Sequence, residues 1–267
     1  MNYQLICSDI DGTLLNKNRE LSEATIKEVQ RLSHIPFVLI SSRMPKAMRH
    51  LQDILGNTTT PIIAYNGGLI LNNDTVIEST TINNTVLESI IEKCINTSIH
   101  LSLYHADEWY VPSLDYWAER EINNTKVYPK VKSNSDVLET WKTEGKGAHK
   151  IMCMGDEHEI DFLYKTLEKE HDNDIILYRS KATYIEISHR AISKKTAIET
   201  LINHSYPHIA LNDVIAFGDN YNDIEMLKSV GLGIAVANAN EEVLKIAKKV
   251  TETNKNDGVA LALKNLF

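Results

Sequence analysis

Leu5-Ile6-Cys7-Ser8-Asp9-Ile10-Asp11-Gly12-Thr13 begins as an unbroken apolar run and ends in two aspartates and a glycine. An apolar run without polar alternation is typical of a strand that is buried on both faces of a sheet. After it, Ser22 is placed to cap a helix that turns Ile26, Val29 and Leu32 inward. A second apolar run follows at 36–40. Strand, helix, strand in this order predicts the start of a parallel sheet.

The C-terminal part of the chain repeats this pattern. Val214–Phe217 is apolar and is followed by an acidic run, then by a helix and by another apolar stretch at 231–236. Both ends of the chain therefore predict one α/β domain, a doubly wound parallel sheet of the Rossmann-like kind. We expect this core to comprise residues 1–82 and 189–267.

The middle of the chain, residues 83–188, has a different pattern. Amphipathic helices there alternate with paired strands near 101–111 and with further strands near 150–154 and 183–187, which predicts an inserted α+β domain. It contains all three tryptophans and seven of the eleven tyrosines. Aromatic rings of this kind suit a domain core and a substrate-facing surface equally well.

Composition narrows the classes of protein. The chain has 267 residues, a formal charge of -8 and no block of basic residues, so nucleic acid is not expected as a partner. Its three cysteines form no C-x-x-C pair, and the first residues lack a basic, apolar leader. We expect a cytoplasmic protein without a membrane partner, monomeric or a weak homo-oligomer.

Two acidic runs each follow a predicted strand directly. Asp9 and Asp11 come after the first strand, and Asp219 and Asp223 come after Val214–Phe217. Alone, the first run also fits an ordinary Asp-Gly turn and the second also fits a helix cap. Together they favour one oxygen-rich site at the carboxyl edge of the sheet, where ligands bind in such folds. Such a site suits Mg²⁺.

Hydroxyl and basic residues follow two other predicted element boundaries. Ser41-Ser42-Arg43 comes after the second strand, and Ser193-Lys194 begins a helix where the chain returns to the core. A hydroxyl with neighbouring backbone N–H groups and one lysine would bind the oxygens of a phosphoryl group.

Taken together, four segments resemble the motifs of the haloacid dehalogenase superfamily, and specifically its Cof-type phosphatases. They are Asp9–Leu15, Ser41 with Arg43, Ile192-Ser193-Lys194, and the run 218–227, GDNYNDIEML. Tyr65-Asn66-Gly67-Gly68 and the segments 237–240 and 256–260 are similar to the same subfamily. The chain departs from it at Ser41-Ser42, where Thr-Gly is usual: serine keeps the hydroxyl, but Ser42 lacks the backbone freedom of glycine.

The resemblance implies the chemistry of the acidic residues. Asp9 would be the nucleophile that forms an aspartyl-phosphate, and Asp11 would be the general acid and base. Mg²⁺ would be held by the Asp9 and Asp219 carboxylates and the Asp11 carbonyl, with Asp223 supporting them. The position of the insertion, after Ser41, is that of the larger α+β cap.

The resemblance also implies which residues bind the substrate. Ser41, Lys194 and Asn66 would hold the phosphoryl group. Weaker candidates are Ser42, Arg43, Asn222 and Asn238 at the rim, and Arg179, Lys181 and Tyr184 in the inserted domain, for which surface charge is an equal explanation.

The expected function is Mg²⁺-dependent hydrolysis of small phosphorylated metabolites, in particular sugar phosphates. Phosphoryl transfer of the phosphomannomutase kind and a non-catalytic phospho-aspartate signalling module remain alternatives. A dinucleotide-dependent oxidoreductase is disfavoured, because its Gly-x-Gly-x-x-Gly run is missing after the first strand.

Overall fold

The computed structural model describes residues 3–267, except for the side chain of Ser180. The chain forms two compact units. One comprises residues 1–43, 48–78 and 193–267, and the other comprises 44–47 and 79–192. We call the first the core unit and the second the inserted domain. No helix in the described part of the chain is both long enough and apolar enough to cross a membrane.

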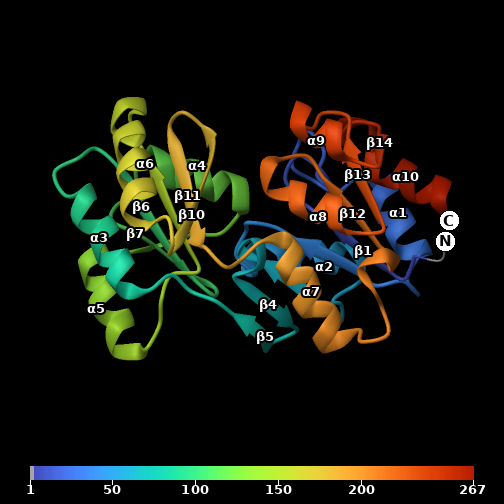
Figure 1. Ribbon diagram of the computed structural model, residues 1–267, viewed down its shortest axis with the longest axis horizontal. Coiled ribbons are helices and arrows are strands. Elements are labelled where there is room, and N and C mark those ends of the chain that lie inside the picture. Colours follow the sequence, from blue (N-terminus) through green and yellow to red (C-terminus); the bar gives the residue numbers. More distant parts are fainter. Residues whose placement is uncertain (1–2) are drawn as a thin grey trace. The chain divides into compact units, whose positions relative to one another are not determined.

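The core unit is built on an eight-stranded sheet with the order β14-β13-β12-β1-β2-β3-β4-β5 (Figure 1). Strands β14 to β3 run parallel, whereas β4 pairs antiparallel with β3. The predicted doubly wound sheet is confirmed, and β4 and the edge strand β5 extend it. The strands are β1 (Leu5–Ser8), β2 (Phe37–Ile40), β3 (Ile62–Ala64), β4 (Leu69–Asn72), β5 (Thr75–Ser79), β12 (Val214–Gly218), β13 (Leu232–Val236) and β14 (Lys249–Thr251).

Helices follow the parallel strands because each crossover between them needs a covering element. Ser22 caps α1 by accepting a hydrogen bond from the Thr25 N–H, as the sequence predicts. On one face of the sheet, α7, α8 and α9 bury residues such as Ile198, Leu227 and Val243 against Cys7 and Ala216. The helices are α1 (Glu23–Arg31), α2 (Lys46–Leu55), α7 (Lys194–Ser205), α8 (Ile224–Ser229), α9 (Glu241–Ile246) and α10 (Gly258–Leu266), with short 3-10 turns at Tyr65–Gly67, Leu211–Asp213, Tyr221–Asp223 and Asn254–Asn256.

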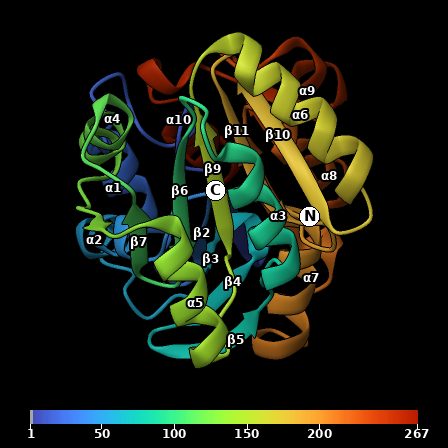
Figure 2. The same cartoon turned by 90° about the vertical axis from the view of Figure 1, so that its left-hand side faces the viewer.

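The inserted domain has its own six-stranded sheet, with the order β10-β11-β9-β6-β7-β8. Its elements are α3 (Asn84–Cys94), β6 (His100–His105), β7 (Glu108–Val111), α4 (Tyr116–Thr125), β8 (Lys130–Val131), α5 (Asn134–Glu144), β9 (Lys150–Met154), α6 (Glu157–His171), β10 (Ile175–Lys181) and β11 (Tyr184–His189). Figure 2 shows α3, α5 and α6 along one face of this sheet. They bury Ile90, Trp141 and Leu163 against Leu103 and Ile151 of the strands. A separate hydrophobic core thus supports this domain.

One buried histidine links separate segments of the inserted domain. The Nδ1 atom of His149 accepts a hydrogen bond from the Ala106 N–H at 3.2 Å, so its Nε2–H donates to Ser79 Oγ at 3.0 Å. Burial, and to a lesser extent the nearby His105, lowers the pKa of His149 to about 3. The native fold therefore holds this ring in its neutral form.

We expect His149 to make the protein acid-sensitive. Below pH ~6.5 the unfolded chain binds a proton at this ring that the folded chain does not, so stability falls as pH falls. At pH 5 the loss from this residue is about 2 kcal/mol relative to pH 7.5. Urea unfolding of the wild type and of His149→Gln at both pH values measures it. An identical pH dependence in the two proteins would contradict the assignment.

Candidate active site

The two acidic runs lie at the ends of neighbouring strands. Ser8 of β1 is in register with Phe217 of β12 in a parallel pair, and the Asp9 N–H donates to the Phe217 carbonyl at 3.0 Å. Asp9 and Asp219 therefore leave the sheet at the same carboxyl edge, within the core unit. This is the juxtaposition that the sequence pattern predicts.

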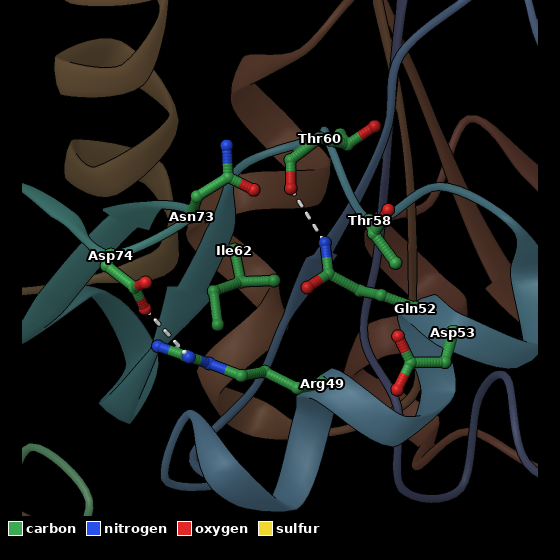
Figure 3. Close-up of a pocket in the computed structure, with 8 residues that line it drawn as sticks. All are labelled: Arg49, Gln52, Asp53, Thr58, Thr60, Ile62, Asn73 and Asp74. Carbon is green, nitrogen blue, oxygen red and sulfur yellow. Dashed lines mark hydrogen bonds and ion pairs between the residues drawn. The ribbon is translucent and has the colours of Figure 1, made fainter.

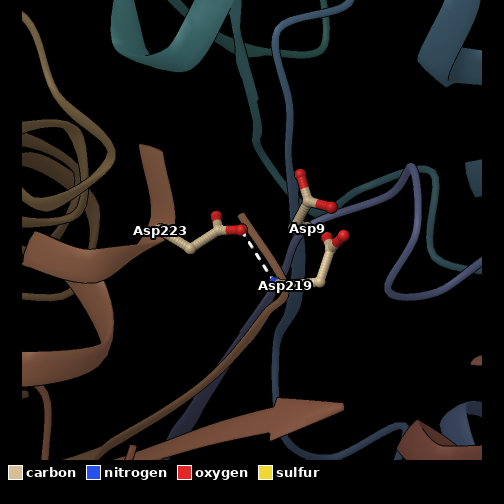
Figure 4. Close-up of side chains that lie close together, drawn as sticks. All are labelled: Asp9, Asp219 and Asp223. Atoms are coloured by element: carbon tan, nitrogen blue, oxygen red, sulfur yellow. Dashed lines mark hydrogen bonds between the residues drawn. The ribbon is translucent and has the colours of Figure 1, made fainter. Parts of the chain in front are cut away.

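Three carboxylates gather at this edge. Asp9, Asp219 and Asp223 each offer an oxygen within 4.8 Å of the others, and Figure 4 shows their carboxylates close together. Asp223 is fully buried, and its Oδ2 accepts hydrogen bonds from the N–H groups of Asp219 (2.9 Å) and Asn220 (3.0 Å). Thr13 donates to Asp219 Oδ1 at 2.8 Å. Asp223 thus fixes the loop that presents Asp219.

A buried lysine lies between two of these carboxylates. The Nζ of Lys194 is 2.6 Å from Asp9 Oδ1 and 2.6 Å from Asp223 Oδ1, and its side chain is 0% exposed. Burial alone would lower the pKa of Lys194, but the Asp223 and Asp9 carboxylates raise it. Lys194 starts α7, where Ser193 caps the helix by a capping box with Thr196. The cap thus fixes the direction in which the lysine leaves the helix.

The acidic cluster carries more negative charge than Lys194 offsets. Burial raises the pKa of Asp9 well above its usual value, and the nearby Asp223 and Asp219 raise it further. Burial and Asp223 raise the pKa of Asp219 to about 6. Crowded carboxylates with raised pKa values and only oxygen donors fit a hard divalent cation such as Mg²⁺.

Asp11 points into a different environment from the three clustered carboxylates. Its two oxygens accept a bidentate pair of hydrogen bonds from Arg43, at 2.6 Å from Nε and 2.7 Å from Nη2. Arg19 Nη1 lies 3.7 Å from the same carboxylate. The Asp11 side chain is 44% exposed, whereas that of Arg43 is only 6% exposed. Arg43, expected only at the rim, thus holds Asp11 in one orientation.

The loop after β2 keeps its hydroxyl and does not need a glycine. Ser41 Oγ accepts a hydrogen bond from the Arg43 N–H at 3.2 Å, and the Ser41 carbonyl accepts one from the Asn66 N–H at 2.8 Å. Ser42 has a negative φ, unlike Asn66, whose φ is +57°. The serine at position 42 is therefore accommodated without backbone strain.

The asparagines predicted at the rim connect loops around the cluster. Asn222 donates to Asn66 Oδ1 at 3.1 Å. Asn238 donates to the Gly12 carbonyl at 2.8 Å and accepts from the Asn254 N–H at 2.8 Å. Sequence reasoning did not assign Arg19 or the bond of Thr13 to Asp219. The signal for Thr13 was its place directly after Gly12 in the first acidic run.

The predicted residues of the inserted domain lie on β10 and β11. Arg179 forms an ion pair with Asp161 and donates to the Ala182 carbonyl at 2.8 Å. Cationic groups of Lys181 (5.8 Å) and Arg120 (5.7 Å) lie near the ring centre of Tyr184. Arg179 is therefore bound by residues of its own domain, and the ring of Tyr184 lies near the side chains of Lys181 and Arg120.

A separate pocket of about 190 Å³ lies in the core unit near α2. Figure 3 shows two interactions among its polar groups: Gln52 donates to the Thr60 carbonyl at 2.7 Å, and Arg49 pairs with Asp74 at 3.0 Å. None of the predicted site residues lines it. The acidic cluster remains the candidate active site.

Comparison with known proteins agrees with this fold and identifies the family. A sequence model of the haloacid dehalogenase-like hydrolases matches residues 6–263. The chain therefore belongs to this family. It is 34% identical to the "Putative phosphatase" of Haemophilus influenzae, over 100% of this chain and 99% of that protein. Together with further relatives that bear the name phosphatase, this makes the enzyme a phosphatase.

Two solved structures extend the likeness to the whole fold. A haloacid dehalogenase-like hydrolase from Bacteroides thetaiotaomicron superposes with a TM-score of 0.90 at 28% identity, with 100% of both chains covered. A sugar phosphatase of subclass IIB has a TM-score of 0.82 over 98% of both chains, and at 21% identity it shows the fold alone.

Gly12 leaves no room for a side chain beside the Asp219 carboxylate. Its φ is +87°, and an added Cβ would lie 2.4 Å from Asp219 Oδ2. We expect Gly12→Ala to displace this carboxylate and to weaken Mg²⁺ binding about tenfold, which corresponds to about 1.4 kcal/mol. Titrating Mg²⁺ against phosphate release measures this change.

Gly145→Ala is the matched control for Gly12→Ala. Gly145 also has a positive φ, +66°, but an added Cβ would meet no atom within 4 Å. Alanine at this position has the backbone strain of a left-handed residue, about 1–2 kcal/mol, but it causes no clash at the active site. An equal shift in Mg²⁺ requirement for both variants would show that strain, rather than the contact with Asp219, is responsible.

Proposed function

We propose that this phosphatase hydrolyses small phosphorylated metabolites, sugar phosphates foremost, with Mg²⁺ and through an aspartyl-phosphate on Asp9. The observation that carries the proposal is the buried cluster in which Asp9 lies beside Asp219, Asp223 and Lys194. A carboxylate beside a lysine and an oxygen-rich cation site is equipped to accept a phosphoryl group.

Asp9 is proposed as the nucleophile. One of its oxygens attacks phosphorus while the bond to the leaving oxygen breaks, and water later hydrolyses the resulting acyl phosphate. Lys194, 2.6 Å from Asp9, and Ser41 would donate hydrogen bonds to the phosphoryl oxygens as negative charge spreads over them. Asn66, at the same end of the site, would add a donor there.

Asp11 is proposed as the general acid and base. It would protonate the leaving oxygen and afterwards take a proton from the attacking water. Its bidentate contact with Arg43 makes Arg43 a positioning residue that keeps Asp11 directed rather than free to rotate.

Mg²⁺ is proposed to bind between Asp9, Asp219 and the Asp11 carbonyl. When bound, it supplies positive charge that offsets the repulsion between a carboxylate and an anionic phosphate. Asp223 would act through its bonds to the Asp219 and Asn220 N–H groups, holding the loop that presents Asp219.

The inserted domain is proposed to select the organic part of the substrate. Tyr184, with Lys181 and Arg120 near its ring, offers cationic and aromatic surface for a polar metabolite, and Arg179 would orient this edge. One relative, 27% identical, is the 5-amino-6-(5-phospho-D-ribitylamino)uracil phosphatase YitU of Bacillus subtilis. Its substrate therefore joins the sugar phosphates as a test compound.

The test is phosphate release by the full chain from p-nitrophenyl phosphate, a panel of sugar phosphates and the ribitylaminouracil phosphate, with Mg²⁺ and with EDTA. We expect release that requires Mg²⁺ and ranks the panel. Transfer of phosphate between positions of one sugar without release would establish a mutase. A phosphoenzyme that persists after acetyl phosphate, with no turnover, would establish a signalling module.

Asp11→Asn should separate the two chemical steps. With sugar phosphates we expect kcat to fall about 100-fold or more, because a poor leaving group needs the proton. With p-nitrophenyl phosphate the first step needs no acid, so a burst of nitrophenolate equal to the enzyme concentration should precede slow turnover. Stopped-flow absorbance detects the burst. Equal losses on both substrates without a burst would exclude this role for Asp11.

A further inference from the structure

A small pocket lies in the inserted domain between α4 and the sheet. Met152 and Met154 of β9 line it, whereas Ile151 between them belongs to the hydrophobic cluster under α3, α5 and α6. Because neighbouring side chains of a strand point to opposite faces, the pocket lies on the other face of the sheet. Its volume is about 50 Å³, and a single water molecule needs about 10–15 Å³ of such space. The pocket thus has room for a group of a few heavy atoms, but not for a whole sugar.

The guanidinium of Arg120 lies at this pocket beside two aromatic rings. It is 5.8 Å from the ring centre of Trp117, three residues earlier on α4, and 5.7 Å from that of Tyr184 on β11. All three residues line the pocket. A cation over the face of an aromatic ring is attracted by the π electrons of the ring, and this contact uses no hydrogen-bond donor. The two rings thus fix the position of the charge and leave its N–H groups available.

Arg120 differs in this respect from the other arginines of the chain. Each of the other six forms an ion pair with an aspartate or a glutamate. In the described part of the chain, no hydrogen bond or ion pair involves Arg120. Glu121 also lines the pocket, but adjacent positions of a helix do not face each other. Lys181 adds a second cation, 5.8 Å from the ring centre of Tyr184, so cations outnumber the carboxylate around the pocket.

The start of α4 is tied to strand β6. Asp115 caps the helix, because its Oδ1 accepts hydrogen bonds from the N–H groups of Trp117 and Ala118, both at 3.0 Å. Its Oδ2 accepts one from His100 Nδ1 at 2.7 Å, since an ionised carboxylate can only accept. The His100 side chain is itself buried in the sheet. The helix is thus held in one position, and Arg120 is oriented before a ligand binds.

We propose that this pocket is a subsite for an anionic group on the organic part of the substrate, either a carboxylate or a second phosphate, which Arg120 binds through two of its N–H groups. The proposal rests on the function proposed above, in which the inserted domain selects that part of the substrate. Carboxylate and phosphate oxygens match the fork of donors on a guanidinium, and both groups fit the volume of the pocket. The preferred substrates are then phosphorylated sugar acids or sugar bisphosphates rather than neutral sugars with one phosphate.

The experiment compares two matched pairs of substrates, with the full-length protein and Mg²⁺. Gluconate 6-phosphate differs from glucose 6-phosphate by a carboxylate, and fructose 1,6-bisphosphate differs from fructose 6-phosphate by a second phosphate. The two pairs therefore distinguish the two sources of negative charge. Release of the 6-phosphate, followed by phosphorus NMR, gives kcat/KM for each compound. We expect the anionic member of one pair to be preferred by about tenfold or more, mainly through KM, as charge-assisted hydrogen bonds contribute.

Three variants assign this preference to a side chain. Arg120→Gln removes the charge and the fork of donors, so it should abolish most of the preference within the pair. Arg120→Lys keeps a charge near the rings but loses the bidentate geometry, and should retain part of it. Arg190→Gln is the matched control, because Arg190 also lies in the inserted domain, where it is half-exposed and 3.6 Å from Asp172. It should leave the kinetics on all four compounds unchanged.

Two kinetic results would overturn the proposal. If Arg120→Gln lowers kcat/KM equally for both members of a pair, Arg120 only holds α4 against Tyr184. If the wild type prefers neither anionic compound, the pocket takes no anion, although hydrolysis of the neutral members would still support the proposed phosphatase function.

Binding without turnover separates the subsite from the proposed reaction. Calorimetric titration of the full-length protein in EDTA with gluconate 6-phosphate, fructose 1,6-bisphosphate and their neutral partners needs no hydrolysis. Tighter binding of an anionic member, lost in Arg120→Gln and kept in Arg190→Gln, would support the subsite even if no compound were hydrolysed. Equal binding within both pairs, or no binding, would overturn it. Thermal unfolding of each variant checks that it is folded.

Discussion

Asp9→Asn is expected to lower Mg²⁺-dependent phosphate release at least about 1,000-fold, on every substrate of the panel. An amide cannot form the acyl phosphate, so the loss should appear in kcat and should not be repaired by more substrate or more Mg²⁺. Phosphate release under saturating conditions measures it. Because every substrate needs the proposed nucleophile, whatever its leaving group, p-nitrophenyl phosphate should be affected as strongly as sugar phosphates.

The structure indicates that Asp9→Asn will fold. Asp9 is 6% exposed, and burial, Asp223 and Asp219 raise its pKa well above the usual value. In the metal-free protein the charged form of this carboxylate is therefore disfavoured, and a neutral side chain of the same shape removes repulsion. We expect the unfolding temperature in EDTA to be unchanged or higher than that of the wild type. A folded variant that retains activity would place the nucleophile elsewhere.

Comparing the burst in Asp9→Asn with that in Asp11→Asn distinguishes the roles of the two acids. Asp11 lies two residues away, yet its carboxylate contacts Arg43 rather than the acidic cluster. Loss of the burst in Asp9→Asn and its retention in Asp11→Asn would assign separate roles to two neighbouring acids. If neither variant shows a burst, the two chemical steps are not separated between Asp9 and Asp11.

The core of the fold could be predicted because its strands are buried on both faces. Runs such as Leu5–Ser8 and Val214–Gly218 are fully buried, so their sequences are almost continuously apolar, and their short length and the turn residues after them identify them as strands. Acidic residues directly after two parallel strands must meet at one edge of the sheet. The proximity of Asp9 and Asp219 can therefore be predicted from local sequence patterns.

Other features depend on contacts between distant segments, which local patterns do not encode. The edge strand β5 is mostly exposed and carries no continuous apolar signal. The clamp of Arg43 on Asp11 joins residues 32 positions apart in the sequence. The burial of Lys194 is in the same category: its resemblance to a family motif distinguishes it from Lys195, but residue type and spacing alone do not show that one is buried and the other is 38% exposed.

Lys194→Met is therefore expected to have the second largest effect, on both stability and catalysis. The substitution keeps an unbranched side chain of nearly the same length but removes the charge between Asp9 and Asp223. Leaving one side of a buried ion pair without its partner typically costs about 3–5 kcal/mol. We expect a loss of this size in urea unfolding in EDTA at pH 8, and a fall in kcat of about 100-fold or more from the missing donor.

The pH dependence of Lys194→Met distinguishes this charge effect from a simple packing defect. Without the lysine, the pKa of Asp9 in the folded variant should rise further, because the attraction that lowered it is gone. A raised folded pKa means that the folded variant binds a proton that the unfolded chain has released. Both proteins lose stability from Asp9 as pH rises above ~4, but the wild type stops losing it at its own, lower Asp9 pKa, so the gap between variant and wild type should be wider at pH 8 than at pH 5.5. Lys195→Met, which removes an exposed lysine paired with Glu199 at 3.5 Å, should change stability by less than about 1 kcal/mol at both pH values. Equal behaviour of the two variants would mean that Lys194 does not neutralise the acidic cluster.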